Sequence, residues 1–275
     1  MKVCVIGLGE VGLVTAKYVS DRKLDVCGYD VDVTAADRAR KAGIVSATHV
    51  WDTVPLSNLY LICVSTGFRN NLPDLSPVFD VCKKIKDKAS SYPFVSIEST
   101  VLPGTCKRIF RDIFKKHARL VHVPHRYYAE EPVNHGVKQL RVIGGVDADS
   151  LEHGLEFYRD VLEIPLHVVS RVEVAEMCKI SENANRYIQI AFAEELRMIC
   201  EEIGLSFDEV RKACNTKWNT EVLEARDGIG GHCLPKDIRY LSSLTSFHTL
   251  TNGALSVDRQ YRKWLKRLIK NERVE

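Results

Sequence analysis

The chain has 275 residues, which is enough for two domains that each bury a hydrophobic core. It is 45% hydrophobic and 27% charged with a formal net charge of +3, so neither a disordered chain nor a fibre is expected. No block rich in lysine and arginine dominates, and no stretch reaches the roughly 18–20 apolar residues of a membrane span, so we expect no nucleic-acid partner and no membrane span.

The first half of the chain alternates short β-branched runs with helical patterns, which is typical of a parallel sheet covered by helices. It predicts an α/β fold with an N-terminal Rossmann unit, that is, a doubly wound parallel sheet. The expected strands are Lys2–Ile6, Asp25–Tyr29, Leu59–Ser65, Phe94–Glu98, Leu120–Val123 and Arg141–Gly144.

A glycine-rich turn follows the first expected strand directly and opens a helix. The first glycine permits a tight turn, the second lets the backbone approach a pyrophosphate, and the third lets the helix pack against the strand. The helix N-terminus then offers free N–H groups to the phosphates. The expected cofactor-binding residues of this turn are Gly7, Gly9, Glu10, Val11 and Gly12.

An aspartate, Asp30, ends the second expected strand, where an acid is required to hold a ribose hydroxyl. Asp32 lies close by and no arginine follows at once, so a 2′-phosphate is repelled and NAD is favoured over NADP. A Rossmann unit without a cofactor, or with a flavin, is the alternative.

The pattern changes near residue 170. Ser170-Arg171-Val172-Glu173 has the form of a capping box, and helical-period sequence continues without a breaker to Gly204. About 30 residues of helix span roughly 45 Å, more than one small domain needs. Ser206 is expected to cap a further helix. We therefore predict an NAD-binding domain over residues 1–169 and a helical domain with a long connecting helix over residues 170–275.

A second glycine-rich segment, Gly228–Asp237, contains Cys233. The neighbouring His232 and Lys236 favour the thiolate, which is the nucleophilic form. The other eight cysteines are dispersed without a C-x-x-C pair, which indicates a reducing, cytoplasmic setting and no metal site. A cysteine in such a loop favours a functional role. The alternative is a small buried residue like the other eight.

Lys179 and Asn183 lie four residues apart on the long helix and therefore share one face. Their neighbours are largely apolar. Two interpretations stay open from the helix alone: a surface lysine whose stem covers apolar area, or a partly desolvated lysine suited to acid–base work.

Four segments in this order resemble the UDP-glucose/GDP-mannose dehydrogenase family over nearly the whole chain. They are the Rossmann opening, Glu98–Thr105, Lys179–Asn183 and Gly230–Asp237, and Leu72–Ser76 fits as well. The His-Cys pair of the last segment is most similar to the branch that oxidises UDP-N-acetylmannosamine-type sugars. The resemblance implies an oxidoreductase that converts a nucleotide-sugar alcohol to a uronate by two hydride transfers to NAD.

The resemblance also implies residue roles. Cys233 captures the intermediate aldehyde as a thiohemiacetal, and water cleaves the thioester that follows. Lys179 and Asn183 hold the oxyanion and the attacking water, Thr100 positions that water or the substrate hydroxyl, and Asp237 orients its neighbours. The residues expected near the nicotinamide are Val64, Ser65, Thr66, Glu98 and Ser99.

One departure from the family lies directly after the expected strand Leu120–Val123, where the family has Pro-Glu and this chain has Pro124-His125. His125 can serve as the general base near neutral pH. The alternatives are that Glu130 or Glu131 replaces the glutamate, that the hydrolysis step is lost, or that His125 is a solvent-facing loop residue.

A second departure is that the family's C-terminal UDP-binding domain is expected to be absent. Either a separate chain supplies it, or the substrate is smaller, or other contacts hold the nucleotide sugar. Because helical domains of this family pair through the long helix, the resemblance implies a homodimer. Two other functions stay open: a two-electron β-hydroxyacid-type dehydrogenase, and an NAD-binding regulatory protein without catalysis.

Overall fold

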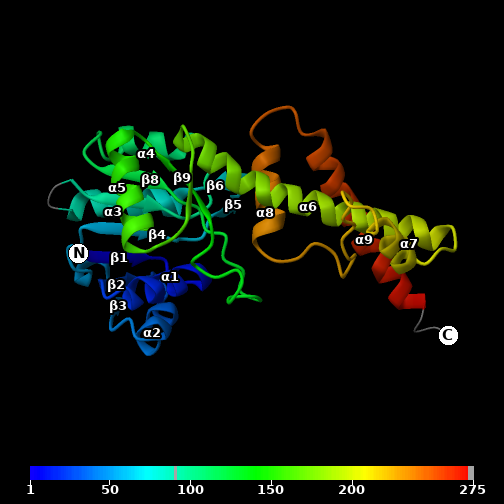
Figure 1. The fold of residues 1–275 in the computed structure, drawn as a ribbon, viewed down its shortest axis with the longest axis horizontal. Helices are drawn as coiled ribbons and strands as arrows, with labels where there is room; N and C mark the ends of the chain where they lie inside the picture. Colours follow the sequence, from blue (N-terminus) through cyan, green and yellow to red (C-terminus); the bar gives the residue numbers. More distant parts are fainter. Residues whose placement is uncertain (90–91, 272–275) are drawn as a thin grey trace. The chain divides into compact units, whose positions relative to one another are not determined.

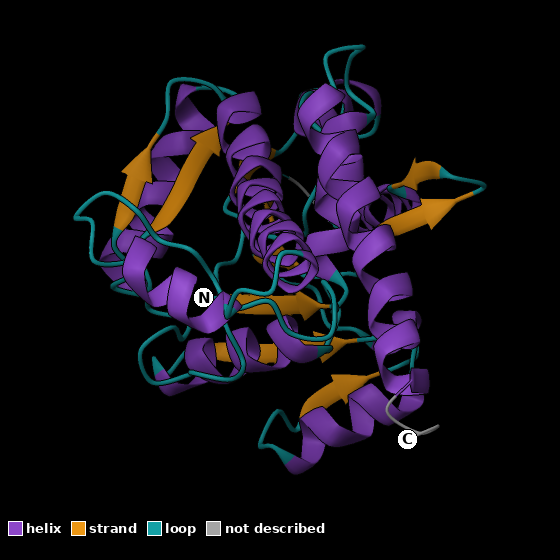
Figure 2. Cartoon of the chain, turned by 90° about the vertical axis from the view of Figure 1, so that its right-hand side faces the viewer, coloured by secondary structure: helices purple, strands orange, loops and turns teal. Residues whose placement is uncertain are grey.

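The structure is a computed structural model that describes residues 1–89 and 92–271. The chain divides into two compact units, Met1–Lys179 and Ile180–Glu275, which are described separately. All strands of the described residues belong to the first unit, and the second is helical (Figures 1 and 2). Within the described ranges, no helix has the length and apolar character that a membrane crossing requires.

The first unit is built on an eight-stranded sheet with the order β10-β9-β8-β7-β4-β1-β2-β3. Its strands are β1 (Lys2–Ile6), β2 (Asp25–Tyr29), β3 (Ser46–Thr48), β4 (Leu59–Ile62), β7 (Phe94–Ile97), β8 (Arg119–His122), β9 (Arg141–Gly145) and β10 (Leu166–Val168). A separate hairpin pairs β5 (Gly67–Arg69) with β6 (Leu72–Asp74). The predicted Rossmann architecture is confirmed, except that β9 runs antiparallel to β8.

Helices cover both faces of this sheet (Figure 1). On one face α1 (Glu10–Asp21) and α2 (Val33–Lys41) pack with the π-helical segment η2 (Glu156–Val161), which continues α5 (Ala148–Leu155). On the other face lie α3 (Ser76–Lys88) and α4 (Thr105–Asp112). A short 3-10 helix, η1 (Trp51–Thr53), precedes β4. The apolar strands are therefore buried on both sides, as a parallel sheet requires.

The long helix α6 spans Val172–Glu202, 31 residues. The two compact units divide inside it, after Lys179, whereas the sequence pattern places the domain boundary at its start. The reason is that its first turns pack on the sheet unit. The Glu176 carboxylate accepts hydrogen bonds from the backbone N–H groups of Gly104 and Cys106, at 2.6 and 2.7 Å. Glu173 pairs with Lys107 at 2.6 Å.

The second unit combines the rest of α6 with α7 (Phe207–Cys214), α8 (Cys233–Ser242) and α9 (Thr249–Asn271). Ser206 caps α7, as expected, by accepting a hydrogen bond from the Glu209 N–H. Tyr187 of α6, Ile238 of α8 and Ala254 of α9 form one core of this unit.

Glu194 of α6 lies in the second unit with a side chain that is fully buried. Neither of its carboxylate oxygens has a hydrogen-bond partner among the described residues. Burial, followed by the nearby negative charge of Asp258, raises its pKa from 4.5 to about 8, while Arg262 opposes the shift. Burial first, and the charge of Glu194 among the lesser causes, raise the pKa of Tyr187 and that of Tyr261.

We expect Glu194→Gln to stabilise the protein at pH 8.5 by roughly 2–4 kcal/mol and to change its stability little at pH 4.5. Since the folded state holds this proton up to about pH 8 and the unfolded state releases it near 4.5, wild-type stability falls across that window. Urea titrations at both pH values measure the difference. Glu195→Gln, on an exposed neighbour, is the control; equal effects of the two substitutions at pH 8.5 would contradict the prediction.

Candidate cofactor and catalytic sites

The glycine turn after β1 has the backbone that the sequence pattern predicts. Gly7 adopts φ +88°, and a Cβ there would lie 2.6 Å from the Cys63 carbonyl oxygen. A Cβ on Gly12 would lie 1.7 Å from the Gly7 carbonyl oxygen, so no side chain fits at either position. A Cβ on Gly9 meets nothing within 4 Å. Gly9 is also the N-cap of α1, so the start of this helix is open for a ligand to approach.

Asp30, directly after β2, is bound to this turn. Its Oδ2 accepts a hydrogen bond from the Leu8 N–H at 2.6 Å, and its Oδ1 accepts one from the Asp32 N–H at 2.9 Å. The carboxylate is therefore fixed beside the glycine turn, where an acid that holds a ribose hydroxyl belongs. The glycine backbone and this acid fit a dinucleotide.

The segments after β4 and β7 carry the other residues predicted near the nicotinamide. The Thr66 hydroxyl donates to the Thr100 carbonyl at 2.9 Å. The Ser99 hydroxyl donates to the Val64 carbonyl at 2.7 Å. These bonds join the two strand ends, with Val64 half-buried and Ser65 exposed.

Glu98 lies in the same segment but is fully buried, at the centre of a polar network. Its Oε1 accepts a hydrogen bond from the Tyr158 hydroxyl at 2.6 Å, and its Oε2 lies 3.2 Å from Arg141 Nη1. Ser96 is 2.7 Å from the Tyr158 hydroxyl, so the network reaches through the sheet to η2. Sequence patterns did not identify Arg141 or Tyr158, because nothing local marks a residue that becomes buried against a distant carboxylate.

His125, predicted as the catalytic base, is only 6% exposed, so the solvent-facing alternative is wrong. Its Nε2 lies 2.9 Å from the Thr15 hydroxyl of α1, 2.8 Å from Arg141 Nη2 and 3.2 Å from Glu98 Oε2. Burial, then the positive charges of Arg141 and Lys179, hold the pKa of His125 well below its usual range. The imidazole is therefore neutral at pH 7 and accepts a proton only weakly.

Lys179, at the end of the first unit, is half-buried and forms no salt bridge with any residue described. Its charge is one cause of the lowered pKa of His125 and also of His122, whose pKa burial lowers to about 3. Lys179 thus places an ammonium group close to two buried histidines, His122 at the end of β8 and His125 directly beyond it. A free ammonium of this kind can stabilise a developing negative charge.

In the second unit, Asn183 and Asp237 are brought together as a pair. Asn183 Nδ2 donates to Asp237 Oδ2 at 2.5 Å, and Asp237 is fully buried. The ammonium of Lys236 is bonded to the other oxygen of Asp237 and lies 4.5 Å from the centre of the Tyr240 ring. The positive charge of Lys236 is therefore paired with the carboxylate of Asp237, which reduces its ability to stabilise a thiolate at Cys233.

Cys233 is the first residue of α8, so the glycine-rich segment proper is Gly228–His232 and Cys233 directly follows it. It is exposed, whereas the other eight cysteines, all in described residues, are buried or half-buried. The alternative that Cys233 is a small buried residue is therefore wrong. A thiol at a helix N-terminus lies where the helix dipole favours its ionised form.

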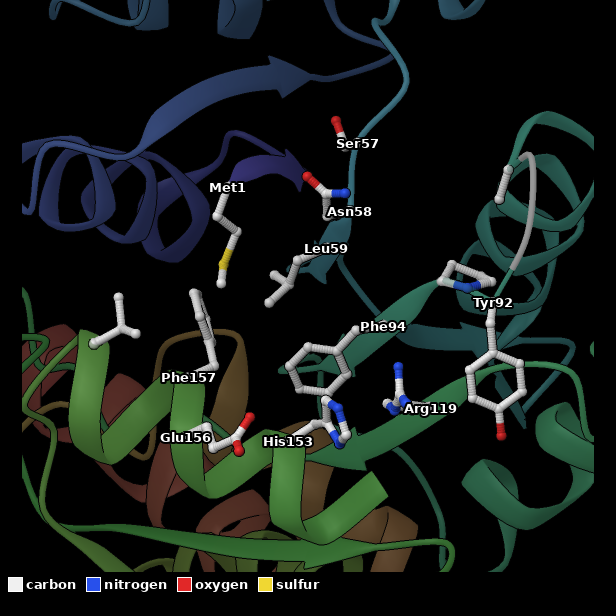
Figure 3. Close-up of a pocket in the computed structure, with 13 residues that line it drawn as sticks. Met1, Ser57, Asn58, Leu59, Tyr92, Phe94, Arg119, His153, Glu156 and Phe157 are labelled. Carbon is white, nitrogen blue, oxygen red and sulfur yellow. The ribbon is translucent and has the colours of Figure 1, made fainter. Parts of the chain in front are cut away.

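A pocket of about 380 Å³ lies elsewhere in the first unit (Figure 3). Its lining includes Leu59, Phe94 and Arg119, the first residues of β4, β7 and β8. It is therefore at the amino ends of the strands, opposite the edge where the glycine turn lies. In parallel sheets the carboxyl ends bind the ligands, so this pocket is not the cofactor site. No cluster of three or more potential metal ligands occurs in the described part of the chain.

Two family models together match more than half of the chain. Residues 36–162 match the NAD binding domain of the UDP-glucose/GDP-mannose dehydrogenase family, and residues 173–259 match the central domain of the same family. The chain belongs to the UDP-glucose/GDP-mannose dehydrogenase family. Its first unit is the NAD-binding domain of that family, as the glycine turn and Asp30 predict.

The individual relatives that match this chain include dehydrogenases of nucleotide sugars. The chain is 29% identical over 266 residues to a UDP-N-acetyl-D-mannosamine dehydrogenase from Methanococcus vannielii, a match that covers 89% of this chain and 62% of the relative. Among solved structures, a UDP-D-ManNAc dehydrogenase from Pyrococcus horikoshii superposes with a TM-score of 0.89 at 25% identity, over 98% of this chain and 71% of that one. The chain thus spans about 62% of the length of such a curated relative.

A shorter dehydrogenase shares the fold. The 3-hydroxyisobutyrate dehydrogenase from Mycobacterium tuberculosis superposes with a TM-score of 0.73 at 14% identity, over 96% of this chain and 93% of that chain. At this identity the likeness shows the fold alone.

Proposed function

We propose that the protein is an NAD-dependent nucleotide-sugar dehydrogenase that oxidises a sugar alcohol to the carboxylate through Cys233. The observation that carries the proposal is the placement of Cys233. Of nine cysteines it is the exposed one, and it begins a helix after a glycine-rich segment in a chain of this family. An accessible thiol at a helix start is suited to attack an aldehyde carbonyl.

The proposed reaction has four steps. The alcohol loses a proton from oxygen and a hydride from carbon to give an aldehyde. The thiolate of Cys233 then adds to the carbonyl carbon and the oxygen gains a proton, which gives a thiohemiacetal. Loss of a second hydride and of that proton gives a thioester. Water finally cleaves the C–S bond, releasing the carboxylate and the thiol. NAD, when bound to the first unit, accepts one hydride in each oxidation.

The other residues take supporting roles. Lys179 supplies an ammonium group for the oxyanion. Asn183, which is proposed to hold the oxyanion and the attacking water with it, is oriented by its 2.5 Å hydrogen bond to Asp237. Thr100 is proposed to position water or the substrate hydroxyl. For His125 the buried surroundings favour a role as a neutral hydrogen-bond acceptor over that of a strong base, because protonation brings a charge next to Arg141. Glu130 and Glu131, the alternative bases, are both exposed.

The proposed substrate class is a nucleotide sugar of the kind named for the relatives, a UDP-N-acetylhexosamine, and the protein is proposed to be cytoplasmic. We also propose a homodimer through α6, where the large apolar side chains of Phe192 and Ile199 are exposed at 56% and 48%, and that of Ile203, directly after the helix, at 62%. A separate chain that supplies further contacts to the nucleotide stays a prediction.

The test is NADH formation at 340 nm, measured with a panel of UDP- and GDP-sugars and scored as NADH per sugar consumed. Two NADH per sugar are expected from a UDP-N-acetylhexosamine. One NADH per sugar would favour a two-electron dehydrogenase, a class with which the chain shares its fold. NAD binding without NADH formation from any sugar would reject the dehydrogenase proposal in favour of a regulatory protein.

A further inference from the structure

Ile229, in the glycine-rich segment before Cys233, has both of its backbone polar groups bound to α9. Asp258 Oδ1 accepts a hydrogen bond from the Ile229 N–H at 2.8 Å. Arg262 Nη2 donates to the Ile229 carbonyl at 2.7 Å. The two side chains, one helical turn apart, are also bonded to each other, with Arg262 Nε 2.9 Å from Asp258 Oδ1. The Asp258–Arg262 ion pair of α9 therefore binds both the backbone N–H and the backbone carbonyl of Ile229.

Ile229 lies between Gly228 and Gly230, and Gly231 follows. A Cβ on Gly230 or on Gly231 would meet no atom within 4 Å. Gly228 is different, because it adopts φ +94° and a Cβ there would lie 2.7 Å from the guanidinium carbon of Arg262. The guanidinium thus packs directly on the glycine backbone. Since glycine has the largest backbone freedom, the position of this segment depends on contacts at Ile229.

Asp258 is only 8% exposed, unlike the usual surface carboxylate of an i, i+4 pair. It also accepts a hydrogen bond from the Tyr187 hydroxyl of α6 at 3.2 Å. The Ile229 side chain is buried in the core that contains Tyr187. The ion pair is therefore joined both to the long helix and to the glycine-rich segment that directly precedes Cys233.

We propose that Asp258 and Arg262 are positioning residues that fix the glycine-rich segment and thereby the thiol of Cys233. The part that concerns Cys233 rests on the proposed function. Neither side chain is expected to touch the substrate. Their effect is to restrict the backbone from Gly228 to His232. The start of α8 is thereby fixed, and with it the direction of the Cys233 side chain.

The experiment compares Asp258→Ala and Arg262→Met with the control Arg259→Met, an exposed arginine on the same helix. Hydrogen–deuterium exchange of the full chain reads the Ile229 amide, and steady-state kinetics read kcat and KM. We expect exchange at Ile229 to accelerate at least tenfold and kcat to fall at least tenfold in both variants, with KM for NAD unchanged. Arg262→Lys, which keeps one cationic donor, is expected to recover part of both losses.

Unchanged exchange at Ile229 in Arg262→Met would overturn the proposal. So would faster exchange with unchanged kcat, because the ion pair would then be structural only. If Asp258→Ala does not fold, Asp258→Asn and the two Arg262 variants carry the test. If the wild-type chain forms no NADH from any sugar, the proposed function fails, while the exchange result still decides whether the ion pair fixes the segment.

Discussion

We expect Cys233→Ser to lower kcat for the complete oxidation of the sugar by at least about a thousandfold. A serine hydroxyl is a far weaker nucleophile than a thiolate unless an adjacent base removes its proton, so the aldehyde is not captured. The first hydride transfer does not require the thiol. NADH formation should therefore stop at one NADH per sugar, with free aldehyde as the product, and a spectrophotometric assay with product analysis measures both quantities.

A matched control is Cys214→Ser, which changes a half-buried cysteine at the end of α7 in the same unit. It should leave kcat within about twofold of the wild type, because the substitution only exchanges sulfur for oxygen away from α8. Continued turnover of alcohol to carboxylate by Cys233→Ser would remove the covalent mechanism. Equal losses in both variants would point to a general effect on folding.

The alternation of apolar strands and helical patterns was sufficient to predict the Rossmann unit. The first two strands, Lys2–Ile6 and Asp25–Tyr29, have the predicted bounds because the glycine turn and Asp30 end them sharply. The antiparallel direction of β9 could not be predicted, because it depends on how the loop after β8 returns the chain to the sheet. The division of the two units inside α6 likewise depends on long-range contacts of Glu176.

The candidate sites were predictable to the extent that local chemistry marks them. Glycines that exclude a Cβ and an acid after the second strand have fixed spacings, so Gly7, Gly12 and Asp30 could be identified from sequence. The partners of His125 could not, since Thr15 and Arg141 lie 110 and 16 residues away along the chain. The i, i+4 spacing of Asp258 and Arg262 can be seen in the sequence. Their hydrogen bonds to the Ile229 backbone, about 30 residues earlier in the chain, could not be predicted from it.

Arg141→Met is expected to lower the free energy of unfolding of the first unit by about 3–5 kcal/mol. The Arg141 side chain is 1% exposed, and its removal leaves the fully buried Glu98 carboxylate without its ion-pair partner. The Val137 carbonyl, which accepts a hydrogen bond from Arg141 at 3.0 Å, also loses its donor. An unpaired buried charge costs more than the pair itself contributes, so this substitution should exceed the effect of most single changes. Urea titration followed by circular dichroism measures it.

Arg119→Met provides the comparison, because Arg119 pairs with Asp149 at 2.8 Å where both side chains are partly exposed, at 28% and 46%. Solvent screening limits such a pair to about 1 kcal/mol or less. Adding Glu98→Gln to Arg141→Met should recover part of the loss, since no charge is then left buried. A loss from Arg141→Met no larger than that from Arg119→Met would show that the network does not depend on its charges.

Arg141→Met also tests whether the charge of Arg141 lowers the pKa of His125. Arg141 is, after burial, the next cause that holds the pKa of His125 below its usual range. Removing this positive charge should raise the pKa of His125, although burial and Lys179 continue to oppose protonation. An NMR titration of the His125 ring in Arg141→Met measures the change. If the pKa falls or stays constant, the neutral state of His125 does not depend on Arg141, and the lack of a strong base at this position must be attributed to burial and Lys179.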